Sequence, residues 1–338
     1  MRIGVRLDLV PGLSASDLID LAVLAEDLKY ETIWVPEGIG RDALTQLAAF
    51  AANTKRIKLG TGILPIYYRS PTTMAMSAAG MDVVSNHRFI LGLGVGHPHM
   101  VGQVHGVQYE HPIPRVRETV EIVRRLLKER EVDYQGRFYT LKGATVGPLP
   151  EPARVPIYIA ALGPKMTELA GQIADGALLN WVSHGHMSLS LEQLRAGAMK
   201  SGRDPSEIDI ACYIRVMVTD DPDSAQLGLR RLIARYTFMP DYKKFFESLG
   251  HAKDVAKISN AWRNKGREAA EAAVSEAMIR DMAIVGTAEY CRKEVKKYLS
   301  LGLKMAVIAP FASADTKGTY ISTMKAFIGS FYPDQPGS

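Results

Sequence analysis

The glycine-rich segment "LGLGVGHPH" at residues 91–99 brings two histidines directly behind an apolar run. His97 at such a strand end could donate a proton to a substrate, because the pKa of an imidazole lies near neutrality. Together with His99 and His105 it could also suggest a metal site, but no cysteine or carboxylate pair completes a ligand set of recognised spacing. We therefore take His97 as the candidate proton donor and expect no metal. The structural alternative is a loop histidine that makes one hydrogen bond.

The glycines of this segment do not form a dinucleotide-binding fingerprint. The pattern G-x-G-x-x-G would require a glycine where His97 stands if it began at Gly92, and where His99 stands if it began at Gly94. No G-K-[ST] occurs in the chain, which excludes a Walker A loop. The sequence therefore disfavours both a nicotinamide-type Rossmann site and a P-loop.

The segment "AALGPKMTELAG" at residues 160–171 predicts a phosphate site. A strand ends in a small-residue turn, and a helix begins at Pro164. The amides of Gly163, Lys165 and Met166 would be free at this helix start, where N–H groups and the helix dipole bind phosphate. Lys165 adds a positive charge. The alternative is a plain turn between a strand and a helix.

Further strand ends carry residues that could contact a ligand. Gly60-Thr61-Gly62 interrupts a β-like run with two glycines, which permit unusual backbone angles and a close approach of a ligand. Asp8 and Glu37 place carboxylates behind the first two strands, but their separation is unknown and no glycosidase pair follows. Asn180 and Trp181 end the sixth strand, where an aromatic ring either stacks on a ligand or caps the fold. No Ser-His-Asp arrangement is indicated.

Eight short apolar runs have the character of β-strands, and most precede an amphipathic helix. Alternating strands and helices indicate a parallel sheet, and eight such units indicate a closed (β/α)8 TIM barrel with its active site at the carboxyl ends of the strands. A doubly wound open sheet is the alternative. The predicted strands are residues 3–9, 32–36, 57–61, 88–94, 155–161, 176–181, 208–218 and 305–310.

The segments between these strands predict the surrounding helices. Ser16 is the expected N-cap of the first helix. Residues 132–150 predict a hairpin and a loop, and residues 221–283 predict a charged helical insertion after strand seven, longer than one crossover needs. No linker or repeat divides the chain, so we expect one TIM-barrel domain over residues 1–338. The predicted helices cover about 16–28, 41–53, 71–86, 112–130, 189–200, 287–300 and 315–330, and one more begins at Pro164.

The composition of the chain is typical of a globular protein and argues against a nucleic-acid-binding, disulfide-rich or membrane-spanning one. The chain has 338 residues, 47% of them hydrophobic, which is ample for a large core. Its net charge is +5, and basic clusters such as "RKEVKK" at 292–297 are mixed with acids, so nucleic acid is an unexpected partner. The two cysteines imply no disulfide framework. The N-terminus has no signal-peptide pattern and no apolar run reaches about 18 residues, so we expect a cytoplasmic protein without a membrane span.

Two long stretches carry a resemblance to a known family. The segment "WVPEGIGRDALTQLAAFAANTKRIKLGTGILPIYYRSP", followed by "DVVSNHRFILGLGVG", resembles the luciferase-like monooxygenase superfamily. It is most similar to the branch of coenzyme F420-dependent oxidoreductases and methylenetetrahydromethanopterin reductases. "ALGPKMTELAGQIADGALLNW" is similar to a second signature of that family. The resemblance covers at least residues 1–220.

This resemblance implies a (β/α)8 barrel with a flavin or deazaflavin at the carboxyl ends of the strands. It implies a bulge at the end of strand three, with a non-prolyl cis peptide bond that would be Gly62–Ile63, behind the ring. The phosphate of the cofactor would bind at the predicted helix start, with Asn180 and Trp181 beside the ring or ribityl chain. The residues implied in cofactor binding are Gly62, Ile63, Gly94, Gly96, Ala161, Gly163, Pro164, Lys165, Met166, Asn180 and Trp181.

The chain departs from the reductases of that branch at two positions. They carry an acid where this chain has Arg6 and another where it has His97, and both acids are linked there to pterin binding or protonation. We therefore expect hydride transfer between coenzyme F420 and an unidentified small organic substrate, with His97 and, second to it, Glu37 as proton donors. A homodimer is expected because members of the family are often dimers.

Other functions stay open at the level of sequence. An FMN-dependent monooxygenase that uses reduced flavin and oxygen would need the same phosphate turn. A barrel that binds flavin without turning over a substrate is a third hypothesis. A metal-dependent hydrolase is a fourth, and it predicts metal in the purified protein.

Overall fold

The computed structural model describes residues 2–38, 41–147, 154–311 and 313–328. Its centre is a closed barrel of parallel strands, in which β1 pairs with β2 on one side and with β12 on the other. This closure confirms the predicted TIM barrel and excludes the open sheet. The strands of the barrel, in order around it, are β1 (Arg2–Arg6), β2 (Thr32–Val35), β3 (Lys58–Thr61), β5 (Phe89–Gly94), β8 (Ile157–Ala161), β9 (Gly176–Asn180), β10 (Asp209–Val218) and β12 (Met305–Ala309).

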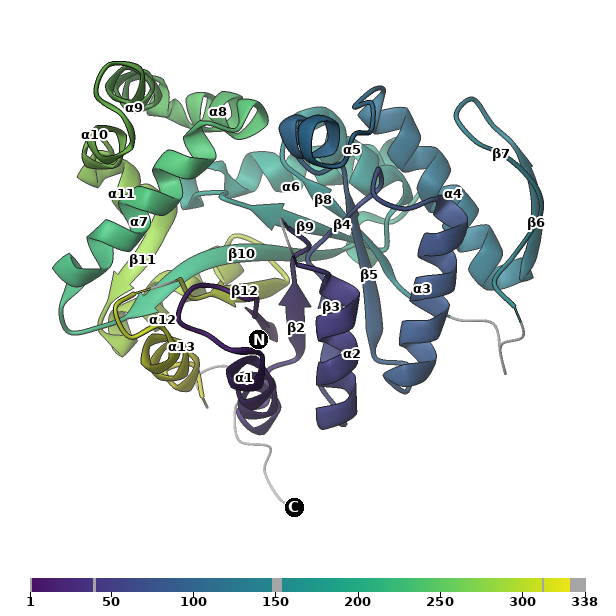
Figure 1. Cartoon of the computed structure of the whole chain (residues 1–338), viewed down its shortest axis with the longest axis horizontal. Coiled ribbons are helices and arrows are strands. Elements are labelled where there is room, and N and C mark those ends of the chain that lie inside the picture. The colour runs from purple at the N-terminus through teal and green to yellow at the C-terminus, as the bar shows by residue number, and fades with distance from the viewer. Residues whose placement is uncertain (1, 39–40, 148–153, 312, 329–338) are drawn as a thin grey trace.

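Amphipathic helices cover the outside of the barrel (Figure 1). The first begins with a capping box at Ser14, not at the predicted Ser16, because the Ser14 hydroxyl accepts from the Asp17 amide while the Asp17 carboxylate accepts from the Ser14 amide. The covering helices are α1 (Ala15–Asp27), α2 (Ala43–Asn53), α3 (Pro71–Val84), α4 (Pro112–Glu129), α5 (Pro164–Ile173), α6 (His184–Lys200), α12 (Ala288–Ser300) and α13 (Thr316–Lys325).

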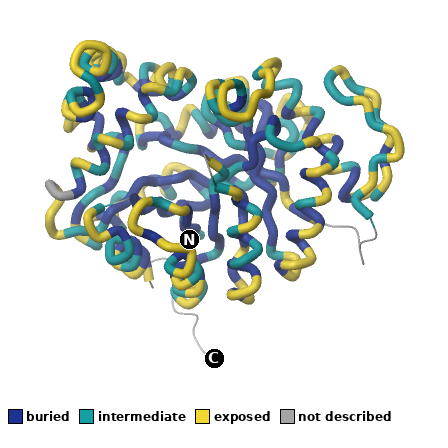
Figure 2. Tube along the Cα trace, in the orientation of Figure 1, coloured by how far each residue is buried: buried dark blue, intermediate teal, exposed yellow. Residues whose placement is uncertain are grey.

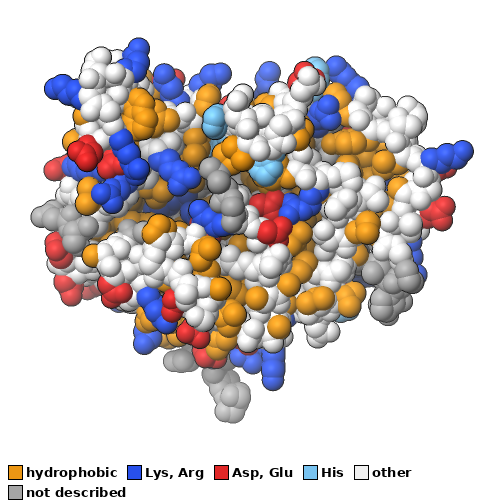
Figure 3. All heavy atoms as spheres, viewed as in Figure 1, with side chains coloured by type: hydrophobic (Ala, Val, Ile, Leu, Met, Phe, Trp, Pro, Cys, Tyr) orange, Lys and Arg blue, Asp and Glu red, His pale blue; other side chains and the backbone are white. Residues whose placement is uncertain are grey.

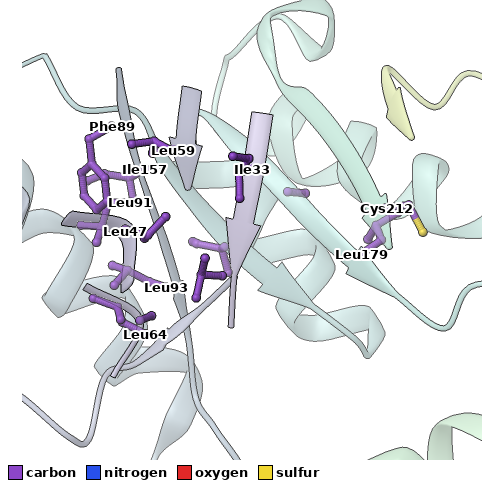
Figure 4. Close-up of a cluster of buried hydrophobic side chains, with 14 of the residues drawn as sticks. Ile33, Leu47, Leu59, Leu64, Phe89, Leu91, Leu93, Ile157, Leu179 and Cys212 are labelled. Carbon is purple, nitrogen blue, oxygen red and sulfur yellow. The ribbon is translucent and has the colours of Figure 1, made fainter. Parts of the chain in front are cut away.

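The main core lies between the barrel and these helices. Figure 2 shows the strands as buried and the outer turns of the helices as exposed. Figure 4 shows part of the core, with Leu47 of α2 and Phe89, Leu91 and Leu93 of β5 among the labelled side chains. The start of α6 at His184, before the predicted residue 189, follows from this packing, because Met187 is fully buried.

The interior of the barrel has its own apolar layer around Trp34, which is 0% exposed. Its indole Nε1 donates to the Thr32 hydroxyl at 2.9 Å. A side chain at Gly60 would collide with the Trp34 ring, so β3 needs glycine there for packing alone. Below this layer the amino ends of the strands are closed by Arg2, which forms ion pairs with Glu31 and Asp209 at 2.7 Å.

Several elements are added to the barrel. The predicted hairpin is present as β6 (Glu131–Gln135) and β7 (Thr140–Thr145), and residues 148–150 of its loop lie outside the described residues. Two strands escaped prediction, β4 (Leu64–Pro65), which pairs with β5, and β11 (Ala283–Gly286), which pairs with the far half of β10. The short helical turns are η1 (Met100–Val104), η2 (Pro205–Glu207) and η3 (Glu247–His251).

The predicted insertion after the seventh barrel strand is present and helical. Its apolar side packs on the carboxyl end of the barrel, because Trp181, Met217 and Phe311 share one buried cluster with residues of the insertion. None of the helices in the described part of the chain is long and apolar enough to cross a membrane. The helices of the insertion are α7 (Pro222–Thr237), α8 (Pro240–Phe246), α9 (Ala252–Lys265), α10 (Arg267–Ala272) and α11 (Glu276–Met282).

Candidate functional site

The carboxyl end of β3 has the predicted bulge. Leu59 pairs with Phe89 and Leu64 pairs with Leu93, so the β3–β4 side has one residue more than β5 over the same span. The predicted cis peptide bond is not found: Gly62–Ile63 is trans, as are the other peptide bonds of the described residues. The backbone here has partners in the trans form, since the Gly62 amide donates to Val35 O at 2.7 Å and Tyr213 Oη donates to Gly62 O at 3.3 Å.

The glycines at the strand ends are explained largely by packing within the protein. A side chain at Gly62 would collide with the Tyr213 hydroxyl, and one at Gly94 would meet Ile63 and the Ala160 methyl group. Gly96 has a φ of +67°, a left-handed conformation that other residues adopt at a cost. Tyr213 and Ile63 therefore occupy the space that side chains at Gly62 and Gly94 would need.

Glu37 lies at the end of β2 in a buried ion pair. Its two carboxylate oxygens accept from Arg69 at 2.5 and 3.0 Å, and one of them also accepts from the Ala43 amide at 3.3 Å. Arg69 continues to Asp42 at 2.7 Å. Because both oxygens of Glu37 have partners, this arrangement suits a residue that fixes the mouth of the barrel better than one that exchanges protons.

Asp8 holds two guanidinium groups at the end of β1. Its Oδ2 accepts from Arg6 at 2.9 Å and from Arg41 at 2.8 Å, and Asp8 is 3% exposed. Burial is the largest single influence on the pKa of Arg6 and lowers it, but the charge of Asp8 and the neighbouring tyrosines together raise it more, so the net shift is upward. Arg6 is therefore a firmly charged residue at this end of the barrel.

Asn180 and Trp181 at the end of β9 lie against Arg215 of β10. The Arg215 guanidinium donates to Asn180 Oδ1 at 2.5 Å and lies 4.1 Å from the centre of the Trp181 ring. Trp181 has a left-handed φ of +60° and is 2% exposed. The structure thus brings these two predicted residues together, with Arg215 between them.

The insertion covers this part of the mouth with two tyrosines. Tyr242 Oη accepts from Asn180 Nδ2 at 2.6 Å, and Tyr236 lies edge-on to Trp181 with ring centres 5.1 Å apart. A separate cavity, lined by Trp181, Tyr213 and Arg280 among others, has a volume of about 30 Å³, which suits a water molecule. Because Arg215 and Tyr236 lie against the Trp181 ring, a ligand ring seated directly over it would require these side chains to move.

His97 also contacts the insertion, with its ring centre 5.5 Å from that of Tyr242. Burial lowers its pKa, more than the nearby Asp241 raises it. His105 instead stacks on Tyr68 at 3.6 Å. In the described part of the chain no group of three or more His, Cys, Asp or Glu side chains is placed to hold a metal ion.

The lowered pKa of His97 predicts a pH-dependent stability. Below about pH 6.5 the unfolded chain binds a proton at His97 more readily than the folded protein does. The contribution of His97 to the free energy of unfolding therefore decreases as the pH is lowered. We expect wild type to lose more unfolding free energy than His97→Gln when the pH is lowered from 7.5 to 5, as measured by urea unfolding.

His251 provides a control of opposite sign. Its hydrogen bond with Asp281 at 2.9 Å raises its pKa, so its contribution is complete below about pH 6.5 and is lost as the pH rises. The unfolding free energy of wild type should therefore exceed that of His251→Gln by more at pH 5 than at pH 7.5. Equal slopes for the two variants would contradict both assignments.

The start of α5 is the open part of the site. Gly163 is its N-cap without a side-chain cap, and a side chain built there would meet nothing within 4 Å. Among the described residues the amides of Gly163 and Lys165 have no hydrogen-bond acceptor, whereas the predicted donor Met166 gives its N–H to Gly163 O at 3.1 Å. Ala161 and Pro164 supply the strand end and the first helical residue. These donors and this space fit a phosphate.

Figure 3 shows basic, acidic and histidine side chains gathered near the middle of the face that carries this end of the barrel. The sequence did not single out Tyr213, Tyr236, Tyr242 or Arg69. An arginine inside the apolar run "IDIACYIRVMV" was the available indication for Arg215, since a charge in a buried strand needs a reason. Nothing in the sequence of the insertion indicates which of its tyrosines reaches the barrel.

Residues 2–305 match the sequence model of the family described as luciferase-like monooxygenase. The chain belongs to this family. Its relatives include a protein of Mycobacterium tuberculosis, provisionally named a coenzyme F420-dependent oxidoreductase, at 29% identity over 91% of this chain and 94% of the relative. The 5,10-methylenetetrahydromethanopterin reductase of Methanolobus tindarius is 30% identical over 89% of this chain and 92% of that protein.

Solved structures of other proteins share the fold. The coenzyme F420-dependent tetrahydromethanopterin reductase of Methanopyrus kandleri has a TM-score of 0.83 at 24% identity, covering 97% of this chain and 98% of that one. A Baeyer-Villiger monooxygenase component of Pseudomonas putida in complex with FMN has a TM-score of 0.73 at 15% identity, covering 98% and 97%. Proteins that share this fold thus include ones whose names carry each of the two cofactors.

Proposed function

We propose that this protein transfers hydride between coenzyme F420 and a small organic substrate. The observation that carries the proposal is the open helix start at Gly163, with two unpaired amides and room for a phosphate, at the carboxyl end of a luciferase-like barrel. The names of the relatives favour F420, since those at 29% and 30% identity are F420-dependent oxidoreductases or methylenetetrahydromethanopterin reductases.

The residues of the chain would bind and orient the reactants, while the bound cofactor would supply the hydride chemistry. Gly163 and Lys165 would hold the phosphate through their amides, and the Lys165 ammonium would add charge. The bulge at Gly62 and Ile63, held by Tyr213, would give the ring a rigid support. His97, half-buried and neutral near pH 7, would accept or deliver a proton at the substrate, and the Glu37–Arg69 pair would hold the end of β2 in place.

The experiment is a direct comparison of cofactors with the purified full-length chain. F420 and FMN, each oxidised and reduced, are titrated while tryptophan fluorescence is followed, because Trp181 lies at the mouth. We expect F420 to bind at least about tenfold more tightly than FMN in the matching redox state. Tighter binding of FMN, with oxygen consumption on adding reduced flavin, would replace this proposal by the monooxygenase alternative. Binding of neither would refute the phosphate assignment.

A further inference from the structure

Arg215 is a buried cation without a counter-ion. It is 2% exposed, and no carboxylate of the described residues forms an ion pair with it. Its guanidinium donates only to neutral oxygens, Asn180 Oδ1 and Tyr213 O, and its Nε–H has no acceptor. A buried charge in this situation is costly, and proteins normally pair it. Besides these oxygens and the Trp181 ring, Arg215 has no partner among the described residues that balances its charge.

Arg6 lies at the same level of the barrel. It is the last residue of β1, and Arg215 is opposite Ala309, the last residue of β12, the strand that separates β1 from β10. Both guanidinium groups face the same Tyr213 ring, at 5.7 Å for Arg6 and 5.9 Å for Arg215. The Nε–H of Arg6 is also buried without an acceptor. Two buried donors without acceptors among the described residues thus belong to guanidinium groups near the same tyrosine ring, at one level of the barrel.

The charges around this region do not balance. Arg6, Arg41 and Arg215 bring three positive charges, and within the described part of the chain the carboxylate paired with any of them is that of Asp8. Of the titratable groups near Arg215, Cys212, Tyr213 and Tyr242 are neutral near pH 7, because burial raises the pKa of Cys212 to about 12 and also raises those of the two tyrosines. What would complete the site is an anion with several acceptor oxygens.

We propose that the mouth binds the organic substrate through a carboxylate, held between the guanidinium groups of Arg6 and Arg215. The claim that the bound acid is the substrate of hydride transfer rests on the proposed function. The claim that this site binds an anion rests on the geometry of Arg6 and Arg215 alone. A carboxylate matches the planar fork of an arginine, because its two oxygens can accept two parallel N–H bonds. The phosphate of the cofactor has a separate place at α5, so the two anions do not compete. The substrate class is therefore a small organic acid.

The test measures binding to the cofactor-free protein. Acetate and benzoate are compared with acetamide and benzamide, their neutral counterparts, by thermal shift and calorimetry at fixed ionic strength. We expect protection by the two carboxylates and none by the amides. Arg215→Gln and Arg6→Gln should each weaken benzoate binding on the order of ten- to a hundredfold, as expected for the loss of a charged hydrogen-bond donor. Arg263→Gln, an exposed residue of α9, is the matched control and should leave binding unchanged.

Folding of the variants is checked by circular dichroism. Arg215→Gln should melt at the same temperature as wild type or higher, since it removes an uncompensated buried charge. If Arg215→Gln folds but binds benzoate as wild type does, or if carboxylates and amides protect equally, the proposal is overturned. If Arg215→Gln instead weakens F420 while carboxylates never bind, the charge serves the cofactor ring and the proposal is also overturned. Carboxylate binding by a protein that binds no F420 would support this inference and refute the proposed cofactor.

Discussion

Replacing Gly163 by aspartate is expected to weaken the binding of F420 on the order of 100-fold. The new carboxylate would lie at the open N-terminus of α5, where nothing approaches a side chain within 4 Å, and would take the amides proposed for the phosphate. Like charges about 4 Å apart repel by about 4 kcal/mol near a protein surface, and exposure to solvent reduces this. The dissociation constant is measured by fluorescence titration of oxidised F420.

The folded state should tolerate this substitution. The φ of Gly163 is −108°, which any residue adopts, and aspartate is a favourable N-cap. Gly163→Ser is the matched control, because serine also caps the helix but carries no charge, and it should cost far less affinity. The effect of aspartate should shrink as salt is raised. An unchanged affinity for Gly163→Asp would remove the phosphate site from α5.

Replacing Trp34 by alanine should destabilise the folded protein by about 3–5 kcal/mol. The side chain is 0% exposed and fills the interior of the barrel, where Gly60 of the neighbouring strand packs against its ring and Thr32 accepts from its indole. Its loss would leave a cavity that the closed barrel cannot collapse to fill, because each strand is held on both sides. Urea unfolding followed by circular dichroism measures the change.

Trp262→Ala is the matched control for this prediction. Trp262 is 43% exposed and stacks on Phe238 at the surface of the insertion, so its removal should cost less than about 1 kcal/mol. Equal losses for the two variants would contradict the central place of Trp34. If Trp34→Ala destabilised only the insertion and left the barrel folded as stably as before, the barrel would tolerate a cavity at its centre.

The barrel could be predicted because the sequence patterns that indicate its strands and helices each lie within a short segment of the chain. Each strand is a short apolar run, each helix shows its periodic face, and the alternation of the two leaves few arrangements that bury both. The helix start at Pro164 was predictable for the same reason, since a strand, a small-residue turn and proline at the first helical position are adjacent in the chain. The extra residue between β3 and β4 followed from the resemblance, whereas the cis bond predicted with it is absent.

Side-chain partners were decided by the tertiary structure. Glu37 was predicted as a possible proton donor, but its role depends on Arg69, which reaches it from the start of a different helix. Trp181 and Asn180 were expected to face a cofactor, and their contacts with Arg215 and with two tyrosines of the insertion depend on residues far away in the sequence. No pattern of spacing encodes such meetings, because they arise only when the strands close into a ring.

The sequence by itself determined the barrel, the insertion after its seventh strand and the phosphate-like start of α5. The tertiary structure alone placed Arg6 and Arg215 near Tyr213. Among the described residues, Asp8 is the one carboxylate paired with any of Arg6, Arg41 and Arg215. The physical reason is that hydrophobic periodicity and turn residues act over a few neighbouring positions in the chain. The balance of charge depends instead on all the side chains that meet in one region of space. That region is enclosed by strands from opposite ends of the chain, and its composition is fixed only when they meet.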